Sequence, residues 1–460
     1  MRIFLVQPKL EHGFFDDIKL PPLGLAYLAA ALRQERHDVR IFDGILSRDQ
    51  FADIRDCMTD FRPEIVGISA TSSLVGTAFR IAGLAKTMDP EPWTVLGGVH
   101  PSLFPEEVSR EAAVDFVVQG EGETSMPALV EALAGGGSPD GLPGIACKSD
   151  GRIIANAPPP LVEDLDTLPF PAYDLLDIPS YYSLQIPAHP FASMITSRGC
   201  PYRCVFCSAR TTMGGKYRCN SPERTVGEIR ELVDRFGVKE VLFKDSEFTF
   251  DAGRVEAFCD LLLRERFRVR WTCNGRIGNA GPTLLEKMRA SGCRCIEYGV
   301  ESGDEEILRT LDKRITLDQI RETFAQTRKA GLKTIANFMI GNPGETRESV
   351  EKSLSLAREI RADYCDFSFA TAFPGTRLYD MALENGWLLD NYDPANVRLD
   401  QCTMNATQMS TEELRQLLKK AFRSFYLRPG YILSRMATLR PFEWKMNALG
   451  LLRVAGIRRS

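Results

Sequence analysis

Short apolar runs alternate with helical stretches along two separate parts of this chain, and no other feature limits its fold as strongly. In the first part, the clearest helix is predicted at residues 23–36, with Pro22 at its first turn, where proline is favoured. Strands are predicted at residues 3–6, 39–42, 65–69, 94–96 and 116–118. Alternation at this spacing is typical of an α/β fold with a doubly wound parallel sheet. We therefore predict a Rossmann-like domain over residues 1–150.

Small and polar residues follow three of these predicted strands. Ligands of doubly wound sheets bind at the carboxyl ends of the strands, and glycines there let the backbone approach a large, flat ligand closely. Each segment alone also fits an ordinary strand-to-helix turn, but three at successive strand ends predict a ligand site. Its candidate residues are Ser69, Thr71, Ser72, Gly97, Gly98, His100, Gly120 and Glu121.

A proline-rich connector, residues 151–191, separates the two alternating parts, because its prolines interrupt regular structure. From residue 192 the alternation resumes, and six repeated strand–helix units predict a partial TIM-like (β/α)6 barrel over residues 192–385. Its active site should lie at the C-terminal ends of the strands. The strands are predicted at residues 193–196, 240–243, 269–272, 295–300, 334–340 and 365–370.

The last part of the chain, residues 386–460, is predicted to be helical and becomes basic towards its end. Between residues 422 and 459, arginines and aromatic residues are interleaved, and Glu443 is the only acidic residue. Such a helix could bind a membrane surface or a partner. We expect instead that its apolar face caps the mouth of the barrel.

Cys200, Cys204 and Cys207 form a Cys-x3-Cys-x2-Cys group directly after the first predicted barrel strand. Three thiolates on one tight loop suit a four-iron, four-sulfur (4Fe–4S) cluster, and since no fourth cysteine follows at ligand spacing, one iron stays open. A structural zinc site needs four closed ligands, and disulfides need an oxidising compartment. The spacing therefore predicts an iron–sulfur cluster with a vacant position at the barrel mouth.

The cysteine loop resembles that of the radical S-adenosylmethionine (SAM) superfamily, and the first domain resembles the cobalamin-binding domain that precedes the barrel in one of its branches. In the barrel the resemblance includes the segments at residues 299–303, 341–346 and 373–378. In the first domain it includes residues 21–25, 97–101 and 120–123. The match covers most of the chain, roughly residues 1–390.

The resemblance implies that the open iron chelates SAM, that an electron from the cluster cleaves SAM, and that a 5′-deoxyadenosyl radical results. The protein would position and shield these reactants. Arg276 would pair with the SAM carboxylate, a task that suits a guanidinium. Asp245 or Glu247 would hold the SAM amino group, and the sequence does not decide between them because it lacks the usual Gly-Gly-Glu. The remaining candidates for SAM are Phe206, Glu301, Ser302 and Asn337.

For cobalamin, the resemblance implies that the candidate residues at the strand ends of the first domain form the site. The usual Asp-x-His-x-x-Gly motif for a cobalt-ligating histidine is absent. His12 lies in the corresponding first loop but in a different context, and members of this branch commonly leave the lower face of cobalamin unliganded. The absence of the motif is therefore compatible with cobalamin.

The favoured function is methylation of an unactivated carbon or phosphorus centre by way of methylcobalamin. A cyclase or rearrangement enzyme with the same cofactors is the alternative, and a non-catalytic cobalamin or iron–sulfur carrier is an alternative of another class. Methylthiolation of tRNA is disfavoured, because only Cys57 and Cys147 precede the connector and the net charge is −4.

We expect a small-molecule substrate, such as a precursor of a secondary metabolite or a lipid, and a reducing partner such as flavodoxin or ferredoxin. Nucleic acid and a membrane span are not expected, since the first apolar run ends at Pro8 and is too short. The chain contains 12 cysteines and no recognisable signal peptide, which favours the reducing cytoplasm.

Overall fold

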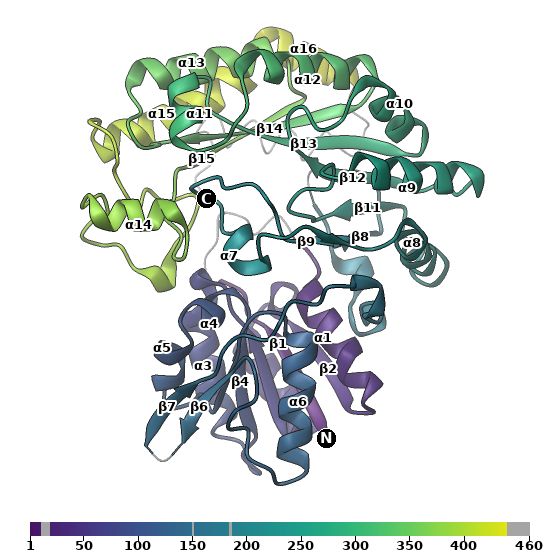
Figure 1. The fold of residues 1–460 in the computed structure, drawn as a ribbon, viewed down its shortest axis with the longest axis vertical. Coiled ribbons are helices and arrows are strands. Elements are labelled where there is room, and N and C mark those ends of the chain that lie inside the picture. Colours follow the sequence, from purple (N-terminus) through teal and green to yellow (C-terminus); the bar gives the residue numbers. More distant parts are fainter. Residues whose placement is uncertain (11–18, 150, 184–185, 439–460) are drawn as a thin grey trace.

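The computed structural model describes residues 1–10, 19–149, 151–183 and 186–438, and it contains two separate large β-sheets with a loop and short helix between them (Figure 1). Among these residues, no helix is both long and apolar enough to cross a membrane. His12 and residues 439–460 of the basic tail lie outside the described residues.

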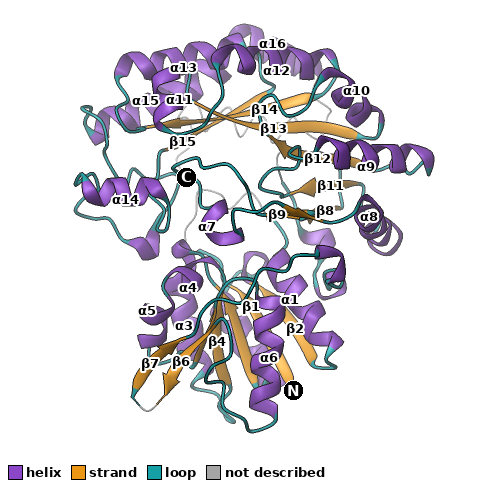
Figure 2. Ribbon diagram, in the orientation of Figure 1, coloured by secondary structure: helices purple, strands orange, loops and turns teal. Residues whose placement is uncertain are grey.

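The first sheet has seven strands in the order β2-β1-β3-β4-β5-β6-β7 (Figure 2). Its first five strands pair in parallel, and the last two are antiparallel. The strands are β1 Arg2–Gln7, β2 Asp38–Asp43, β3 Ile65–Ser69, β4 Trp93–Gly97, β5 Phe116–Val118, β6 Ile145–Ser149 and β7 Arg152–Ala155. The helices are α1 Leu23–Gln34, α2 Gln50–Phe61, α3 Val75–Ala85, α4 Val99–Leu103, α5 Pro105–Arg110 and α6 Gly122–Ala134.

Alternation of side chains along β1 explains why helices cover both faces of this sheet. Ile3 and Leu5 belong to a buried cluster with residues of α1 and α6, whereas Phe4 and Val6 pack with residues of α2 and α3. Successive side chains of a strand point to opposite faces, so a continuous apolar run is buried on both. The predicted doubly wound domain is confirmed, and β7 carries its sheet past residue 150 to Ala155.

The second sheet has six parallel strands in the order β15-β14-β13-β12-β11-β8, as expected for a partial barrel. The strands are β8 Phe191–Met194, β11 Glu240–Phe243, β12 Arg270–Gly275, β13 Cys293–Glu301, β14 Lys333–Ile340 and β15 Tyr364–Phe369. The helices are α8 Pro222–Phe236, α9 Ala252–Arg264, α10 Pro282–Ala290, α11 Glu305–Thr310, α12 Leu317–Lys329, α13 Arg347–Glu359, α14 Arg377–Glu384, α15 Thr411–Tyr426 and α16 Pro429–Thr438.

Single-turn 3₁₀ helices occur mainly in the connector and in loops. They span Gly44–Leu46, Ser72–Leu74, Leu165–Thr167, Tyr173–Leu175, Ile178–Ser180 and Pro394–Asn396. In the connector, Tyr173 is fully buried, and its hydroxyl donates to Glu228 Oε1 of α8 over 2.7 Å. The connector therefore packs into the barrel core.

A short antiparallel ribbon interrupts the barrel after its first strand. It consists of β9 Ser197–Arg198 and β10 Arg218–Cys219, in which Arg198 is the register partner of Arg218. The chain between the two strands carries the three cysteines and the short helix α7 Ala209–Met213. Figure 1 shows α7 in the space between the first domain and the barrel.

The expectation that the aromatic tail caps the mouth of the barrel is wrong for its described part. The hydroxyl of Tyr426, at the end of α15, donates to Cys365 O over 2.7 Å, and that of Tyr431 donates to Asp363 O over 2.9 Å. Both acceptors lie at the start of β15, at the end of the barrel opposite its mouth. The helical tail is therefore an outer layer of the barrel, because its aromatic residues find buried apolar partners there.

Candidate functional site

The three cysteines face a cavity of about 200 Å³ at the C-terminal ends of the barrel strands. Among the described residues, no group of three histidine, cysteine or acidic side chains is close enough to hold a single metal ion. A 4Fe–4S cluster does not need its cysteines to converge on one point, because each cysteine binds a different iron. The cavity is lined by Cys200, Tyr202, Cys204, Phe206, Cys207, Arg210, Ser246, Glu247, Asn274, Gly275, Arg276, Glu297, Gly299, Glu301, Lys313 and Asn337.

The donor set and its surroundings fit such a cluster. Cys200, Cys204 and Cys207 are the only cysteines among the described residues that line the cavity. Burial raises the pKa of the Cys200 and Cys207 thiols, and the positive charge of Lys313 opposes this rise at Cys207. A second cation is close to the third cysteine, since Arg276 Nη1 lies 3.8 Å from Cys204 Sγ. Three thiolates near positive charge are suitable ligands for iron, and no fourth cysteine of the described residues lines the cavity to complete the set.

Arg276 reaches the cavity from the loop after β12 and is held on two sides. Its guanidinium lies 3.6 Å from the ring centroid of Tyr202 and donates to the carbonyl oxygen of Lys313. The contact with the ring restrains the guanidinium, and Arg276 lines the cavity together with the three cysteines and Glu247. This position suits a group that pairs with a carboxylate.

Asp245 and Glu247, which the sequence could not separate, have different positions. Asp245 lies outside the cavity, where its carboxylate accepts hydrogen bonds from Thr196 N, Thr196 Oγ1 and Ser197 Oγ over 2.6–2.8 Å. Glu247 lines the cavity, and its Oε1 accepts from Thr249 N over 3.0 Å and from Arg276 N over 3.2 Å. Burial raises the pKa of Glu247. Only Glu247 can reach a ligand of this cavity.

Glu301 ends β13 in a left-handed conformation, with φ of 69°, at a register shift between β13 and β14. Its Oε1 lies 2.7 Å from Lys313 Nζ, and both side chains are buried. A Cβ at Gly299 would collide with this carboxylate and lie 2.7 Å from Lys313 Nζ, so a larger residue there would displace the ends of both side chains. Such a backbone conformation costs energy in a residue other than glycine and is often kept at functional sites.

The other candidates divide into two groups. Phe206 and Asn337 line the cavity, and Asn337 Nδ2 donates to Glu297 Oε1 over 2.7 Å. Ser302 lies outside it, because its hydroxyl is turned to Ser353 Oγ at 3.3 Å. Glu297 and Lys313 also line the cavity, although no role was predicted for either of them. Glu297 is two residues before Gly299, and the two-residue period of a strand places both on the inner face.

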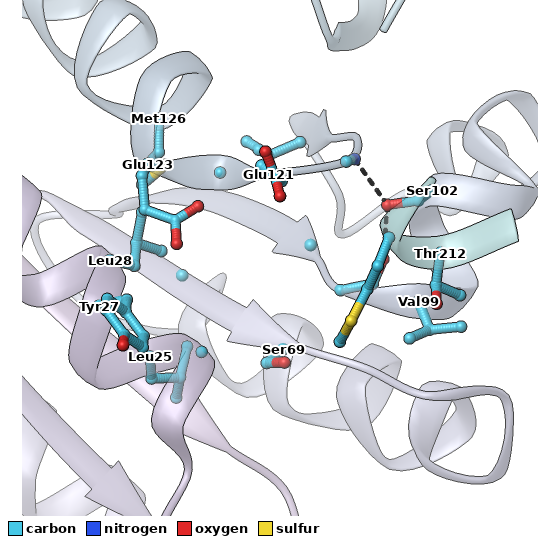
Figure 3. A pocket seen from close by; sticks show the side chains of 18 of the residues that line it. Leu25, Tyr27, Leu28, Ser69, Val99, Ser102, Glu121, Glu123, Met126 and Thr212 are labelled. Atoms are coloured by element: carbon cyan, nitrogen blue, oxygen red, sulfur yellow. Dashed lines mark hydrogen bonds between the residues drawn. The ribbon is translucent and has the colours of Figure 1, made fainter. Parts of the chain in front are cut away.

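A second cavity, of about 300 Å³, lies between the first domain and the cysteine loop. Figure 3 shows Tyr27 and Glu123 on one side of it and Thr212, from α7, on the other. Ser69, Gly97, Gly98, Gly120 and Glu121 line it, as the strand ends predict. The rest of the lining is Gly24, Leu25, Tyr27, Leu28, Gly67, Ile68, Val95, Val99, Ser102, Leu103, Val118, Gly122, Glu123, Met126, Ile195, Arg198, Thr211, Thr212 and Met213.

Thr71, Ser72 and His100 do not line this cavity. His100 is buried behind the wall, where its Nδ1 lies 3.1 Å from Ser72 Oγ, and burial lowers its pKa. Thr71 Oγ1 lies 3.1 Å from Ser73 Oγ. A buried histidine with a hydroxyl partner is a satisfied packing residue rather than a ligand of this cavity.

Comparisons with known proteins match each of the two domains to a known family. The model of the radical SAM superfamily matches residues 194–357, and that of the B12-binding domain matches residues 18–130. An uncharacterized methyltransferase of Pyrococcus horikoshii is 36% identical over 99% of this chain and 98% of its own length. The anaerobic magnesium-protoporphyrin IX monomethyl ester cyclase of Rubrivivax gelatinosus is 28% identical over 94% of this chain and 78% of its own.

Among solved structures, the radical SAM methyltransferase TsrM of Kitasatospora setae, with cobalamin and a 4Fe–4S cluster bound, has the same fold. It superimposes with a TM-score of 0.73 at 19% identity, covering 93% of this chain and 89% of TsrM. The chain therefore belongs to the radical SAM superfamily, in the branch whose members carry a B12-binding domain ahead of the barrel.

Proposed function

We propose that this protein is a cobalamin-dependent radical SAM methyltransferase that methylates an unactivated carbon or phosphorus centre of a small molecule. The observation that carries the proposal is that one loop borders two cavities. Its cysteines face the barrel cavity, while α7 and Arg198 face the first-domain cavity. A cluster with SAM and a cobalamin, bound in these cavities, would lie on either side of a shared substrate space.

In the barrel cavity, Cys200, Cys204 and Cys207 would hold the cluster, which supplies the electron that cleaves SAM. Arg276 would pair with the SAM carboxylate, and Glu247 would accept from the SAM amino group. Glu301 is neutralised by Lys313 and would accept hydrogen bonds from the ribose or the amino end. Buried side chains surround these groups and would exclude water from a reactive centre.

In the first-domain cavity, cobalamin would supply the methyl group as an activated carrier. Gly97, Gly98 and Gly120 leave the strand ends without side chains, so a wide planar ring can approach the backbone. Leu25 and Leu28 of α1 provide an apolar wall for such a ring. No histidine is among the described residues that line this cavity, so these residues supply no imidazole to cobalt.

Methyl transfer is favoured over cyclisation, because the relative named a methyltransferase is more similar, over more of both chains, than the cyclase. The products distinguish the two reactions. Methylation must yield S-adenosylhomocysteine as well as 5′-deoxyadenosine, and mass spectrometry of anaerobic reactions with candidate substrates measures both. Formation of 5′-deoxyadenosine alone with a modified substrate would contradict methylation and favour cyclisation or rearrangement.

A matched pair of variants tests the cluster assignment and the carrier alternative. We expect Cys204→Ala to lose the visible absorbance of the reconstituted 4Fe–4S cluster and the cleavage of SAM. Cys219→Ala should retain both, since Cys219 lies on the neighbouring β10 outside the cavity. Full cluster content in Cys204→Ala would contradict the assignment, and a wild-type cluster without SAM cleavage under reductant would support a carrier.

The proposal includes a reducing partner, such as flavodoxin or ferredoxin, and a cytoplasmic location, because an oxygen-sensitive cluster needs a reducing compartment. Nucleic acid is not part of it, since the net charge of −4 offers no excess of cations for a phosphate backbone.

A further inference from the structure

The cysteine loop is closed at its base by the β9–β10 ribbon, so residues 199–217 form a ring. At the closure Gly199 has φ of 82°, and Cys200 N donates to Gly214 O over 3.1 Å. A Cβ at Gly199 would collide with the carbonyl oxygen of Lys216, so the two ends of the ring are in direct backbone contact. A movement of the ribbon is therefore transmitted to the cysteines.

Both strands of the ribbon present an arginine to the first domain. Arg218 donates to both carboxylate oxygens of Glu121, at 2.9 Å each. Arg198, its register partner, lies 3.2 Å from Glu121 Oε1 and donates to Glu123 Oε1 over 2.5 Å. Glu121 precedes the first residue of α6, so the ribbon that closes the cysteine ring is attached to the start of that helix.

These ion pairs are removed from water. The exposed fraction of the side chain is 1% for Arg218, 10% for Arg198 and 8% for both Glu121 and Glu123. Glu121 also accepts from Val162 N over 2.8 Å, so its oxygens are fully used. Removing one charge of a buried, hydrogen-bonded pair leaves the other uncompensated, so breaking this contact costs more than breaking a surface ion pair.

The same groups are part of the wall of the first-domain cavity. Glu121, Glu123 and Arg198 all line it, together with Thr211 and Thr212 of α7 (Figure 3). None of residues 199–207, which contain the cysteines, lines it. A ligand in this cavity is therefore next to residues that hold the ribbon, although none of residues 199–207 lines the cavity.

We propose that Glu121 and Arg198 are positioning residues that couple occupancy of the first-domain cavity to the geometry of the cysteine loop. The inference rests on the proposed function, in that the occupant is cobalamin and the loop holds the cluster. A ligand that orders the Glu121–Arg198 contact stabilises the ring, and by thermodynamic linkage an ordered ring must raise the affinity for that ligand by the same factor.

Hydrogen exchange of the full-length, cluster-reconstituted protein, with and without saturating hydroxocobalamin, tests the coupling. In the wild type we expect cobalamin to slow exchange of residues 199–207 by about tenfold, within the about 5–150-fold range of coupling between sites. In Glu121→Gln, which places an amide next to two guanidinium groups, cobalamin at a concentration that saturates this variant should leave the exchange unchanged. Glu163→Gln is the matched control, because Glu163 pairs with Lys216 of the same loop at the exposed surface.

Titration of hydroxocobalamin into cluster-loaded and iron-free protein is the reciprocal measurement. The affinity ratio should be about tenfold in the wild type and in Glu163→Gln, and close to one in Glu121→Gln. If Glu121→Gln does not fold, Arg198→Lys replaces it and should give an intermediate ratio, because one ammonium cannot reach both carboxylates.

A ratio of one in the wild type, or a full wild-type ratio in both Glu121→Gln and Arg198→Lys, would overturn the coupling and leave the proposed function intact. Absence of cobalamin binding in every form would instead overturn the proposed function, and the coupling with it.

Discussion

Lys313→Met removes the positive charge that neutralises Glu301 at the mouth of the barrel, and the structure sets the size of the effect. Lys313 Nζ lies 2.7 Å from Glu301 Oε1, and both side chains are less than 10% exposed. Breaking such a pair by removing one partner costs about 3–5 kcal/mol. Because Arg276 is close enough to interact electrostatically with Lys313, it should compensate partly, so we expect about 3 kcal/mol.

Thermal unfolding of the cluster-reconstituted chain under anaerobic conditions measures this loss. One kcal/mol lowers the melting temperature of a domain of this size by about 2–4 °C, so the barrel transition should fall by about 6–12 °C. The double variant Lys313→Met/Glu301→Gln should recover most of the loss, because no buried charge is left unpaired. Lys352→Met, at the exposed pair with Asp304, should shift the transition much less.

A melting temperature of Lys313→Met no lower than that of Lys352→Met would refute this reasoning. So would a double variant as unstable as the single one, because the loss would then come from packing of the lysine stem rather than from the unpaired carboxylate.

Two further predictions concern the cysteine loop and the barrel core. Gly199→Ala should lose bound iron, because its Cβ collides with the Lys216 carbonyl. Gly278→Ala is the control and should keep its iron, because Gly278 has almost the same φ and its Cβ would have no atom within 4 Å. Equal iron contents in the two variants would refute the role of the collision. Burial raises the pKa of Glu228 from 4.5 to about 7, so between these pH values the folded state binds more protons than the unfolded state. The free energy of unfolding should therefore fall by about 3 kcal/mol as the pH rises from 4.5 to 7. Glu228→Gln can still accept the hydrogen bond from Tyr173 but cannot ionise, so its stability should not depend on this titration. In denaturation measured at several pH values, the stability of Glu228→Gln relative to the wild type should therefore increase from pH 4.5 to 7. A difference that stays constant over this range would contradict the raised pKa.

Elements with a strong local pattern were predictable from the sequence. The strands at residues 65–69, 116–118 and 240–243 have the predicted bounds, because a short apolar run between helical stretches carries its own signal. The ribbon β9–β10 and the hairpin β6–β7 were not predicted. Their strands are two to five residues long, and pairing rather than composition makes them strands.

In the candidate site too, some residues were predictable from local motifs and others depended on distant partners. The cysteine spacing predicted the loop, and Arg276 and Glu301 lie beside it as expected. Asp245 and Glu247 are two residues apart in an irregular loop, where no period determines which one faces the cavity. Partners distant in the sequence decided this, since Asp245 is held by Thr196 and Ser197.

The sequence by itself determined the α/β class, the order of the two domains and the position of the cysteine loop, because periodicity and motif spacing are encoded within short segments. Only the tertiary structure decided that Arg198 and Arg218 meet Glu121, 97 positions before Arg218, and that the aromatic tail packs at the end of the barrel opposite its mouth. Such contacts depend on how whole elements pack against one another, and a local pattern cannot specify the partner of a buried charge or of an apolar face.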